Sequence, residues 1–114
     1  MKRGYDRTER VADLIQQALA QMLLQDMNDN RFQLITITGV NVSKDLSYAK
    51  IYVSVLIDEA DKIKEMITDL NLAAKSLRFQ LAKKVKLRIV PELKFVYDEA
   101  AAYGFKINSL LNKM

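Results

Sequence analysis

The segment KKVKLRIVPELKFVYD, residues 83–98, decides the fold, because the end of a basic helix runs directly into a strand with large apolar residues at alternate positions. We expect this strand over residues 87–98. The apolar residues that share one of its faces are Ile89, Leu93, Phe95 and Tyr97. Pro91 cannot donate a ladder hydrogen bond, so we expect the strand to lie at a sheet edge or to be bulged at that residue.

Positive charge is concentrated around the same segment. Between Lys75 and Lys94 there are seven basic residues and one acid, Glu92, a local charge of +6 in a chain whose formal net charge is +4. The basic residues are Lys75, Arg78, Lys83, Lys84, Lys86, Arg88 and Lys94. Such a concentration is typical of nucleic-acid-binding proteins. A solvated helix face is the alternative interpretation, but the lack of interspersed acids and the pI of about 9.3 favour phosphate binding.

Three further groups of residues are weaker candidates for nucleic-acid contact. The basic residues around the start of the first helix are Lys2, Arg3, Arg7 and Arg10. Cations there oppose the helix dipole, which favours a binding role, although Asp6 and Glu9 dilute the charge. Lys44 in a predicted turn is either a turn residue or an exposed phosphate contact. The aromatic residues Tyr48, Tyr52, Phe95 and Tyr97 could stack on unpaired bases, but core packing is the preferred interpretation, above all for Phe95.

Composition excludes several classes of protein. The 114 residues are enough for one domain, and we expect a core over residues 6–98 and a short tail over 99–114. No apolar run is long enough to span a membrane, and no apolar segment follows the first charges as in a secretory signal. The absence of cysteine removes disulfides and favours a cytoplasmic location.

Catalytic motifs are also missing. Without cysteine or histidine there is no zinc finger, thiol nucleophile or serine–histidine–aspartate triad, and the three glycines are too far apart for a phosphate-binding loop. The acids Asp58, Glu59 and Asp61 cluster where a helix should begin, and acids there favour the helix dipole. We therefore expect no enzyme activity, no metal and no cofactor.

Hydrophobic periodicity predicts the order of the elements. An apolar stripe indicates a helix over residues 7–27, and β-branched residues indicate a hairpin of strands at 34–42 and 48–56, with a bulge or close backbone approach at Gly39. A second stripe indicates a helix over 58–86. Because that helix is too long for a domain of this size, we expect it to break near Ala73-Ala74. The order helix, strand, strand, helix, helix, strand predicts a two-layer α+β sandwich with three strands on one side.

Several segments resemble the ribosome-binding factor A family of bacterial small-subunit maturation factors, which have the type II KH-like αββααβ fold. The segments are Arg10-Val11-Ala12, ITITGV at 35–40, VSKDLSYAK at 42–50, Leu77-Arg78 and LRIVPELKFVYD at 87–98. They follow one another through most of the chain. The hairpin motif and the R-x-x-P-E-L-x-F-x-x-D string are specific in combination.

The resemblance includes one departure. The family carries an Ala-x-Gly kink between two helices in place of the G-x-x-G loop of ordinary KH domains, and the matching residues here are Ala73, Ala74 and Lys75. Lysine propagates a helix better than glycine does, so the kink is expected to be less sharp, and it adds a cation near the RNA.

The resemblance implies binding to the immature small (30S) ribosomal subunit and its 16S rRNA during late processing and maturation, with a particular need in the cold. It implies a monomer that acts without a cofactor or small-molecule substrate and leaves before translation. Members often extend beyond the core, and because this sequence stops at Met114 we expect any function of such an extension to be missing or reduced. The alternatives are a protein-interaction module that uses a sheet edge and an enzyme that uses the Asp58-Glu59-Asp61 cluster.

Overall fold

The computed structural model describes residues 7–25 and 30–100. Its elements are α1 (Arg7–Gln25), the 3-10 helix η1 (Asn30–Leu34), β1 (Ile35–Val42), β2 (Tyr48–Val55), α2 (Ala60–Leu72), α3 (Ala74–Lys84) and β3 (Glu92–Tyr97). The predicted order of helices and strands is confirmed, and η1 is an addition that periodicity did not indicate. Most of the predicted tail, residues 101–114, lies outside the described residues.

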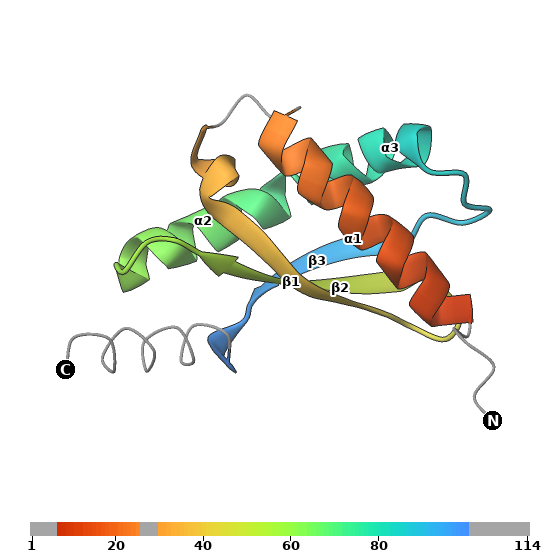
Figure 1. Cartoon of the computed structure of the whole chain (residues 1–114), viewed down its shortest axis with the longest axis horizontal. Coiled ribbons are helices and arrows are strands. Elements are labelled where there is room, and N and C mark those ends of the chain that lie inside the picture. The colour runs from red at the N-terminus through yellow and green to blue at the C-terminus, as the bar shows by residue number, and fades with distance from the viewer. Residues whose placement is uncertain (1–6, 26–29, 101–114) are drawn as a thin grey trace.

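The three strands form one mixed sheet in the order β1-β2-β3. β1 and β2 are antiparallel, and β2 and β3 are parallel because α2 and α3 form the crossover between them. The helices pack on one face of this sheet (Figure 1). The predicted two-layer α+β sandwich is therefore confirmed.

The inward faces of all the elements meet in a single core. Leu70 of α2, Leu77 and Leu81 of α3, and Ile51 of β2 are completely buried. The other fully or almost fully buried side chains of the core include Ile15, Leu19, Met22, Leu23, Val53, Met66 and Phe95. Periodicity at steps of three and four along the helices and of two along the strands accounts for this arrangement.

The predicted bulge at Gly39 is confirmed. The β1–β2 register passes from Ile37 opposite Val53 to Gly39 opposite Tyr52, so one residue of β1 is left over between the two pairs. A side-chain carbon built on Gly39 would meet nothing within 4 Å. The alternative explanation, a close backbone approach, is therefore wrong.

The predicted start of the last strand is wrong. β3 begins at Glu92 rather than at residue 87, and Ile89 is 49% exposed instead of facing the core. The partner strand explains the difference, because Glu92 lies opposite Tyr48, the first residue of β2, and residues before it have no strand to pair with. Pro91 is buried immediately before β3, at the edge of the sheet. Its lack of a donor therefore costs the ladder nothing.

The predicted helix break is confirmed at Ala73, between α2 and α3. Its backbone has φ −85° and ψ −3°, and its N–H is shared between the carbonyls of Asp69 and Leu70 at 3.0 and 3.1 Å. A shared donor of this kind is common at helix termini. Lys75 is the second residue of α3 and does not restore a continuous helix.

Candidate nucleic-acid interface

The outward side of α3 and the loop after it carry the predicted cations. Leu77 and Leu81 direct one side of α3 into the core, which leaves its basic residues in solvent. All six candidate cations of this region are exposed. We call Lys75, Arg78, Lys83, Lys84, Lys86 and Arg88 the α3 basic surface.

Acids do not neutralise the charges of Lys75 and Lys83 in the part of the chain that the structure describes. The sequence has no acid from Leu70 to Pro91, and within the described ranges neither Lys75 nor Lys83 forms an ion pair. Arg78 and Lys83 have contacts of other kinds. The Arg78 Nε donates to the Val90 carbonyl at 3.0 Å, and the Lys83 Nζ lies 4.6 Å from the centroid of the Phe79 ring. Both contacts leave positive charge facing solvent.

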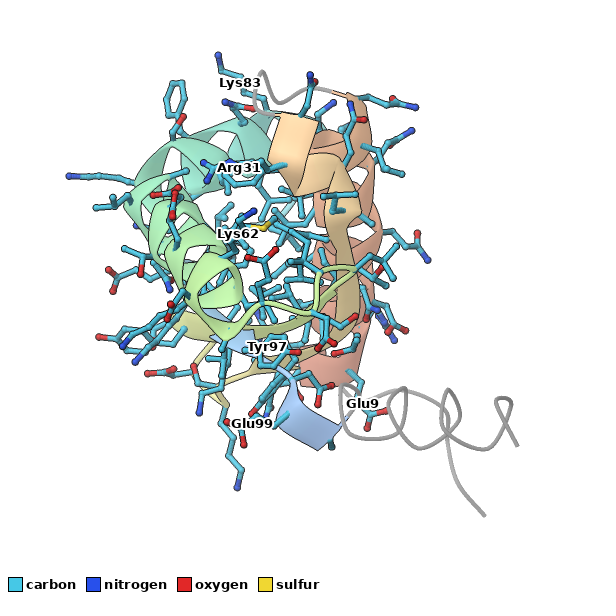
Figure 2. The ribbon with its side chains drawn as sticks, turned by 90° about the vertical axis from the view of Figure 1, so that its left-hand side faces the viewer. Glu9, Arg31, Lys62, Lys83, Tyr97 and Glu99 are labelled. Atoms are coloured by element: carbon cyan, nitrogen blue, oxygen red, sulfur yellow. The ribbon has the colours of Figure 1, made fainter. Side chains whose placement is uncertain are left out.

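The other predicted cations do not join this surface. The start of α1, which carries Arg7 and Arg10, and the β1–β2 turn, which carries Lys44, lie at the lower end of the molecule in Figure 1, whereas α3 lies at the top. Figure 2 shows the same separation, with Glu9 and Lys83 at opposite ends. Arg3 lies outside the described residues.

The β1–β2 turn is built around Asp45. Its carboxylate accepts from the Ser43 hydroxyl at 2.8 Å and from the Ser47 hydroxyl and N–H at 2.6 and 3.1 Å. These bonds, led by that of the Ser47 hydroxyl, hold the pKa of Asp45 below its ordinary value. Leu46 adopts a φ of 63° while its side chain is buried. Lys44 is exposed in this hydrogen-bonded turn. It can therefore be a simple turn residue or an exposed phosphate contact, as the sequence left open.

The end of β3 is acidic. Burial, and then the carboxylates of Asp58, Glu99 and Asp98, raise the pKa of Tyr97. Figure 2 shows Tyr97 and Glu99 at the end of the molecule opposite Lys83. Phe95 is in the core, as predicted. Phosphates would be repelled near Tyr97, so this ring is a poor candidate for RNA stacking.

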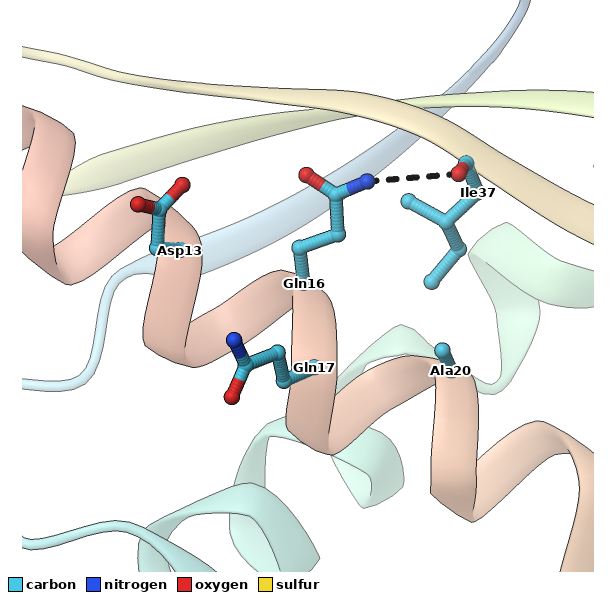
Figure 3. Close-up of a pocket in the computed structure, with 5 residues that line it drawn as sticks. All are labelled: Asp13, Gln16, Gln17, Ala20 and Ile37. Carbon is cyan, nitrogen blue, oxygen red and sulfur yellow. Dashed lines mark hydrogen bonds between the residues drawn. The ribbon is translucent and has the colours of Figure 1, made fainter.

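A hollow of about 390 Å³ lies between α1 and β1, and no basic residue lines it. Its lining residues are Asp13, Gln16, Gln17, Ala20 and Ile37. The Gln16 amide donates to the Ile37 carbonyl at 3.3 Å across it (Figure 3). Its only charged residue is an acid, so the hollow is not suited to a phosphate.

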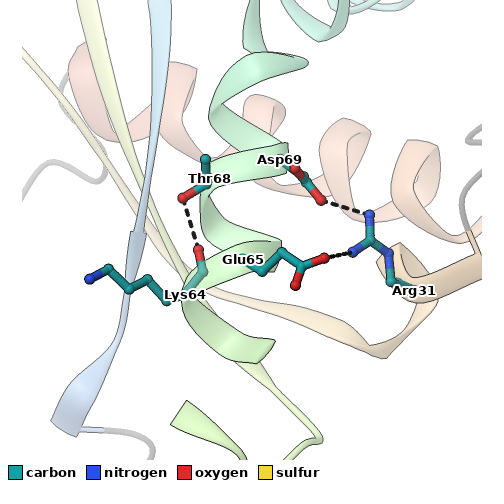
Figure 4. Close-up of polar contacts among 5 residues, drawn as sticks. All are labelled: Arg31, Lys64, Glu65, Thr68 and Asp69. Atoms are coloured by element: carbon teal, nitrogen blue, oxygen red, sulfur yellow. Dashed lines mark hydrogen bonds and ion pairs between the residues drawn. The ribbon is translucent and has the colours of Figure 1, made fainter. Parts of the chain in front are cut away.

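Three charged side chains of α2, Lys62, Glu65 and Asp69, form ion pairs within the fold. Arg31 of η1 reaches across to Glu65 at 3.3 Å and to Asp69 at 2.7 Å (Figure 4). Lys62 pairs with Glu59 at 3.4 Å. Arg31 therefore pairs with two acids of α2, and Lys62 of α2 pairs with the residue before the helix.

The edge of β3 is not open to a partner strand at its centre. The side chain of Asn71 donates to the Phe95 carbonyl at 3.0 Å and accepts from the Phe95 N–H at 2.8 Å. This carboxamide occupies the two backbone groups that an added strand would pair with. The alternative of an interaction module based on this sheet edge therefore loses its main support.

The acids considered for an enzyme lie around the start of α2, as predicted. Glu59 is the residue before the helix and Asp61 lies in its first turn. Residues 7–25 and 30–100 contain no group of three or more histidine, cysteine, aspartate or glutamate residues arranged to hold a metal. None of the helices in these ranges is long and apolar enough to cross a membrane.

Phe79 was not identified from the sequence, although it lies within the α3 basic surface. Its ring is 65% exposed. The available signal was its position, because it falls between Leu77 and Leu81 and outside the apolar stripe of the helix.

Known proteins resemble the whole chain. The family model described as ribosome-binding factor A matches residues 7–111. A ribosome-binding factor A of Pseudomonas fluorescens is 45% identical over 114 residues, which cover 99% of this chain and 86% of the relative. That of Shewanella sediminis is 40% identical over 114 residues, which cover 100% of this chain and 80% of the relative.

Solved structures agree with the sequence relatives. The crystal structure of ribosome-binding factor A from Thermus thermophilus has a TM-score of 0.68 and 29% identity, and the match covers 82% of this chain and 97% of that one. A homology model of the Thermus thermophilus factor, fitted into the cryo-EM map of its complex with 30S, has a TM-score of 0.64 and 31% identity. That match covers 77% of this chain and 91% of the other.

Proposed function

The chain belongs to the ribosome-binding factor A family, and on that premise we propose that it binds the immature small (30S) ribosomal subunit and assists its late maturation. It contacts 16S rRNA, favours the final rRNA processing steps and matters most in the cold. It acts in the cytoplasm as a monomer, catalyses no reaction and leaves before translation begins. The structure of a Thermus thermophilus relative fitted to a 30S complex supports this choice of partner.

The observation that carries the proposal is the α3 basic surface. Six exposed cations on one helix and the loop after it, with no acid among them, match the repeating negative charge of an RNA backbone. Arg7, Arg10 and Lys44 lie at another end of the molecule and would reach different phosphates, and Arg3 precedes them in the sequence.

The proposed mechanism is non-catalytic, because the protein holds RNA in place and does not change it chemically. α3 is packed into the core through Leu77 and Leu81, so the backbone positions that carry its cations are fixed relative to the sheet. Docking on phosphates at that spacing stabilises one local RNA arrangement until the subunit matures. Specificity then comes from the shape of the RNA and from ribosomal-protein contacts rather than from base edges.

Co-sedimentation with immature small subunits over a salt series tests the binding. If six phosphates are neutralised, log affinity should fall with log salt at a slope of about −4, using about −0.7 per contact on single strands. Affinity that does not change with salt would refute the phosphate mechanism.

The maturation role needs a separate measurement in cells. A strain that lacks this protein should accumulate precursor 16S rRNA, and more of it at low temperature. Normal 16S processing at every temperature would remove the maturation role and leave only subunit binding.

A further inference from the structure

Packing does not explain the exposed ring of Phe79. Its neighbours Leu77 and Leu81 are completely buried, while the Phe79 side chain is 65% exposed. Burying a phenylalanine side chain stabilises a fold because it removes a large apolar surface from water. The fold therefore gains only a small part of that stabilisation here, and the ring is available to a partner.

Phe79 borders a shallow groove of about 380 Å³. The groove is lined by Lys75, Arg78, Phe79, Ala82 and Val90. The four α3 residues follow one another at steps of three, one and three, which places them along one face of the helix. Val90 forms the opposite wall, and the 3.0 Å hydrogen bond from Arg78 to its carbonyl holds the loop there.

Cations stand along the helix on both sides of this ring. Lys83, four residues after Phe79, holds its Nζ 4.6 Å from the ring centroid. Lys75, four residues before Phe79, lines the groove on the other side along α3. A flat apolar surface bounded by cations has the properties of a site for a base with a phosphate on each side.

We propose that Phe79 and its groove bind one unpaired nucleobase of single-stranded RNA. The ring stacks on the base, and Lys75, Arg78 and Lys83 contact the flanking phosphates. This inference rests on the proposed function, because it specifies which form of RNA the α3 basic surface accepts. In a duplex the bases are stacked on one another and cannot lie against Phe79, so the site selects unpaired segments.

A single-tryptophan reporter tests the stacking directly. The chain contains no tryptophan, so Phe79→Trp introduces one indole at the proposed site. Leu72→Trp is the matched control, because Leu72 is 79% exposed at the end of α2 and does not line the groove. Each variant is titrated with a single-stranded oligoribonucleotide and with an abasic oligomer of the same length and charge.

We expect the oligoribonucleotide to quench the fluorescence of the Phe79→Trp protein and the abasic oligomer to leave it unchanged. The Leu72→Trp protein should respond to neither. Equal quenching by both oligomers, or equal quenching in both proteins, would overturn the proposal.

Affinity measurements then separate stacking from apolar contact. Phe79→Leu keeps an apolar side chain but removes the ring, and it should weaken binding of the oligoribonucleotide about 5- to 100-fold, the usual range for one stacked base. Binding of the abasic oligomer should not change. Phe79→Tyr keeps the ring and should bind within about 2-fold of the parent chain. Thermal melting of each variant confirms that the fold is intact.

Charge variants distinguish a failure of the nucleobase site from a failure of the proposed function on which it rests. If Lys83→Glu with Lys84→Glu abolishes RNA binding while Phe79→Leu does not change it, stacking is refuted and phosphate binding stands. If neither variant weakens binding, the proposed function fails as well. If Phe79→Leu weakens binding to the subunit but not to the oligoribonucleotide, Phe79 contacts a protein and the nucleobase site is refuted.

Discussion

The helices α2 and α3 belong to one crossover and bury the same kind of residue, but they use their charges differently. α2 combines Asp61, Glu65 and Asp69 with lysines, and its acids Glu65 and Asp69 are paired with Arg31. α3 carries four cations and no acid. The helix α2 therefore pairs part of its charge within the protein, whereas the four cations of α3 are exposed.

The difference shows that two helices at similar places in the fold can use their outward-facing charges differently. Both helices contact β3 through their inward faces, and both are needed to complete the parallel crossover. The sequence of α3 contains cations and no acid, so we assign the proposed phosphate contacts to this second helix. The break at Ala73 separates α2, whose acids Glu65 and Asp69 are paired with Arg31, from α3, which carries the proposed binding surface.

The largest expected effect concerns the buried faces of α2 and α3. It tests whether the two helices contribute equally to the core. Leu70 of α2 and Leu77 of α3 are both completely buried. Replacing either with alanine should lower the free energy of unfolding by about 2–5 kcal/mol, because each leaves a cavity in the core. Urea unfolding measures both losses. A loss confined to one variant would contradict the view that the helices share the core equally.

The second test compares the outward charges with an equal change of charge on each helix. Lys83→Glu with Lys84→Glu on α3 should weaken binding to immature small subunits by roughly 100-fold, because two phosphate contacts become repulsions. Lys62→Glu with Lys64→Glu on α2 should leave binding within about 2-fold, since those lysines lie outside the proposed surface. Sedimentation at one fixed salt concentration measures both. Equal losses would mean that net charge alone governs binding.

The third test weakens the connection between α2 and the sheet. Asn71→Ala leaves the Phe95 N–H and carbonyl at the β3 edge without their partner. It should lower the free energy of unfolding by about 1–3 kcal/mol and speed hydrogen exchange at the Phe95 amide. Asn71→Asp keeps an acceptor for the Phe95 N–H but places a second acceptor against the Phe95 carbonyl, so it should not recover the parent stability. Unchanged exchange in Asn71→Ala would show that the carboxamide does not protect this edge.

The smallest expected effect concerns the ion pairs of α2. Arg31→Ala should lower the free energy of unfolding by only ~0.5 kcal/mol, because partly exposed ion pairs are weak. The loss should shrink in 1 M salt, where the Debye length is only about 3 Å. RNA binding should stay at the parent level. A clear loss of RNA binding would place Arg31 in the interface and remove the contrast between the helices.

Much of the fold could be predicted, because local patterns determine it. The bulge at Gly39 and the break at Ala73 were visible as small residues that interrupt a regular pattern. The start of β3 was not, since it depends on where Tyr48 begins the neighbouring strand. The role of Arg31 was missed for the same reason, because its partners lie 34 and 38 residues away.

The positive charge of the candidate site could be predicted from the sequence, but its three-dimensional shape could not. Counting residues located the cations of α3, because acids are absent around them. The distance between this surface and the start of α1 depends on how the helices cross the sheet, which no local pattern contains. Phe79 was missed because its exposure depends on which side of α3 faces the core.

The salt dependence of a charge-neutralised variant tests the central claim most directly. Lys75, Lys83, Lys84 and Lys86 are replaced by glutamine, and binding to immature small subunits is measured across a salt series beside the parent chain. If these lysines contact phosphates, the slope of log affinity against log salt becomes shallower by roughly 3 units, at about 0.7 per contact. An unchanged slope would contradict the claim that α3 is the helix that binds RNA.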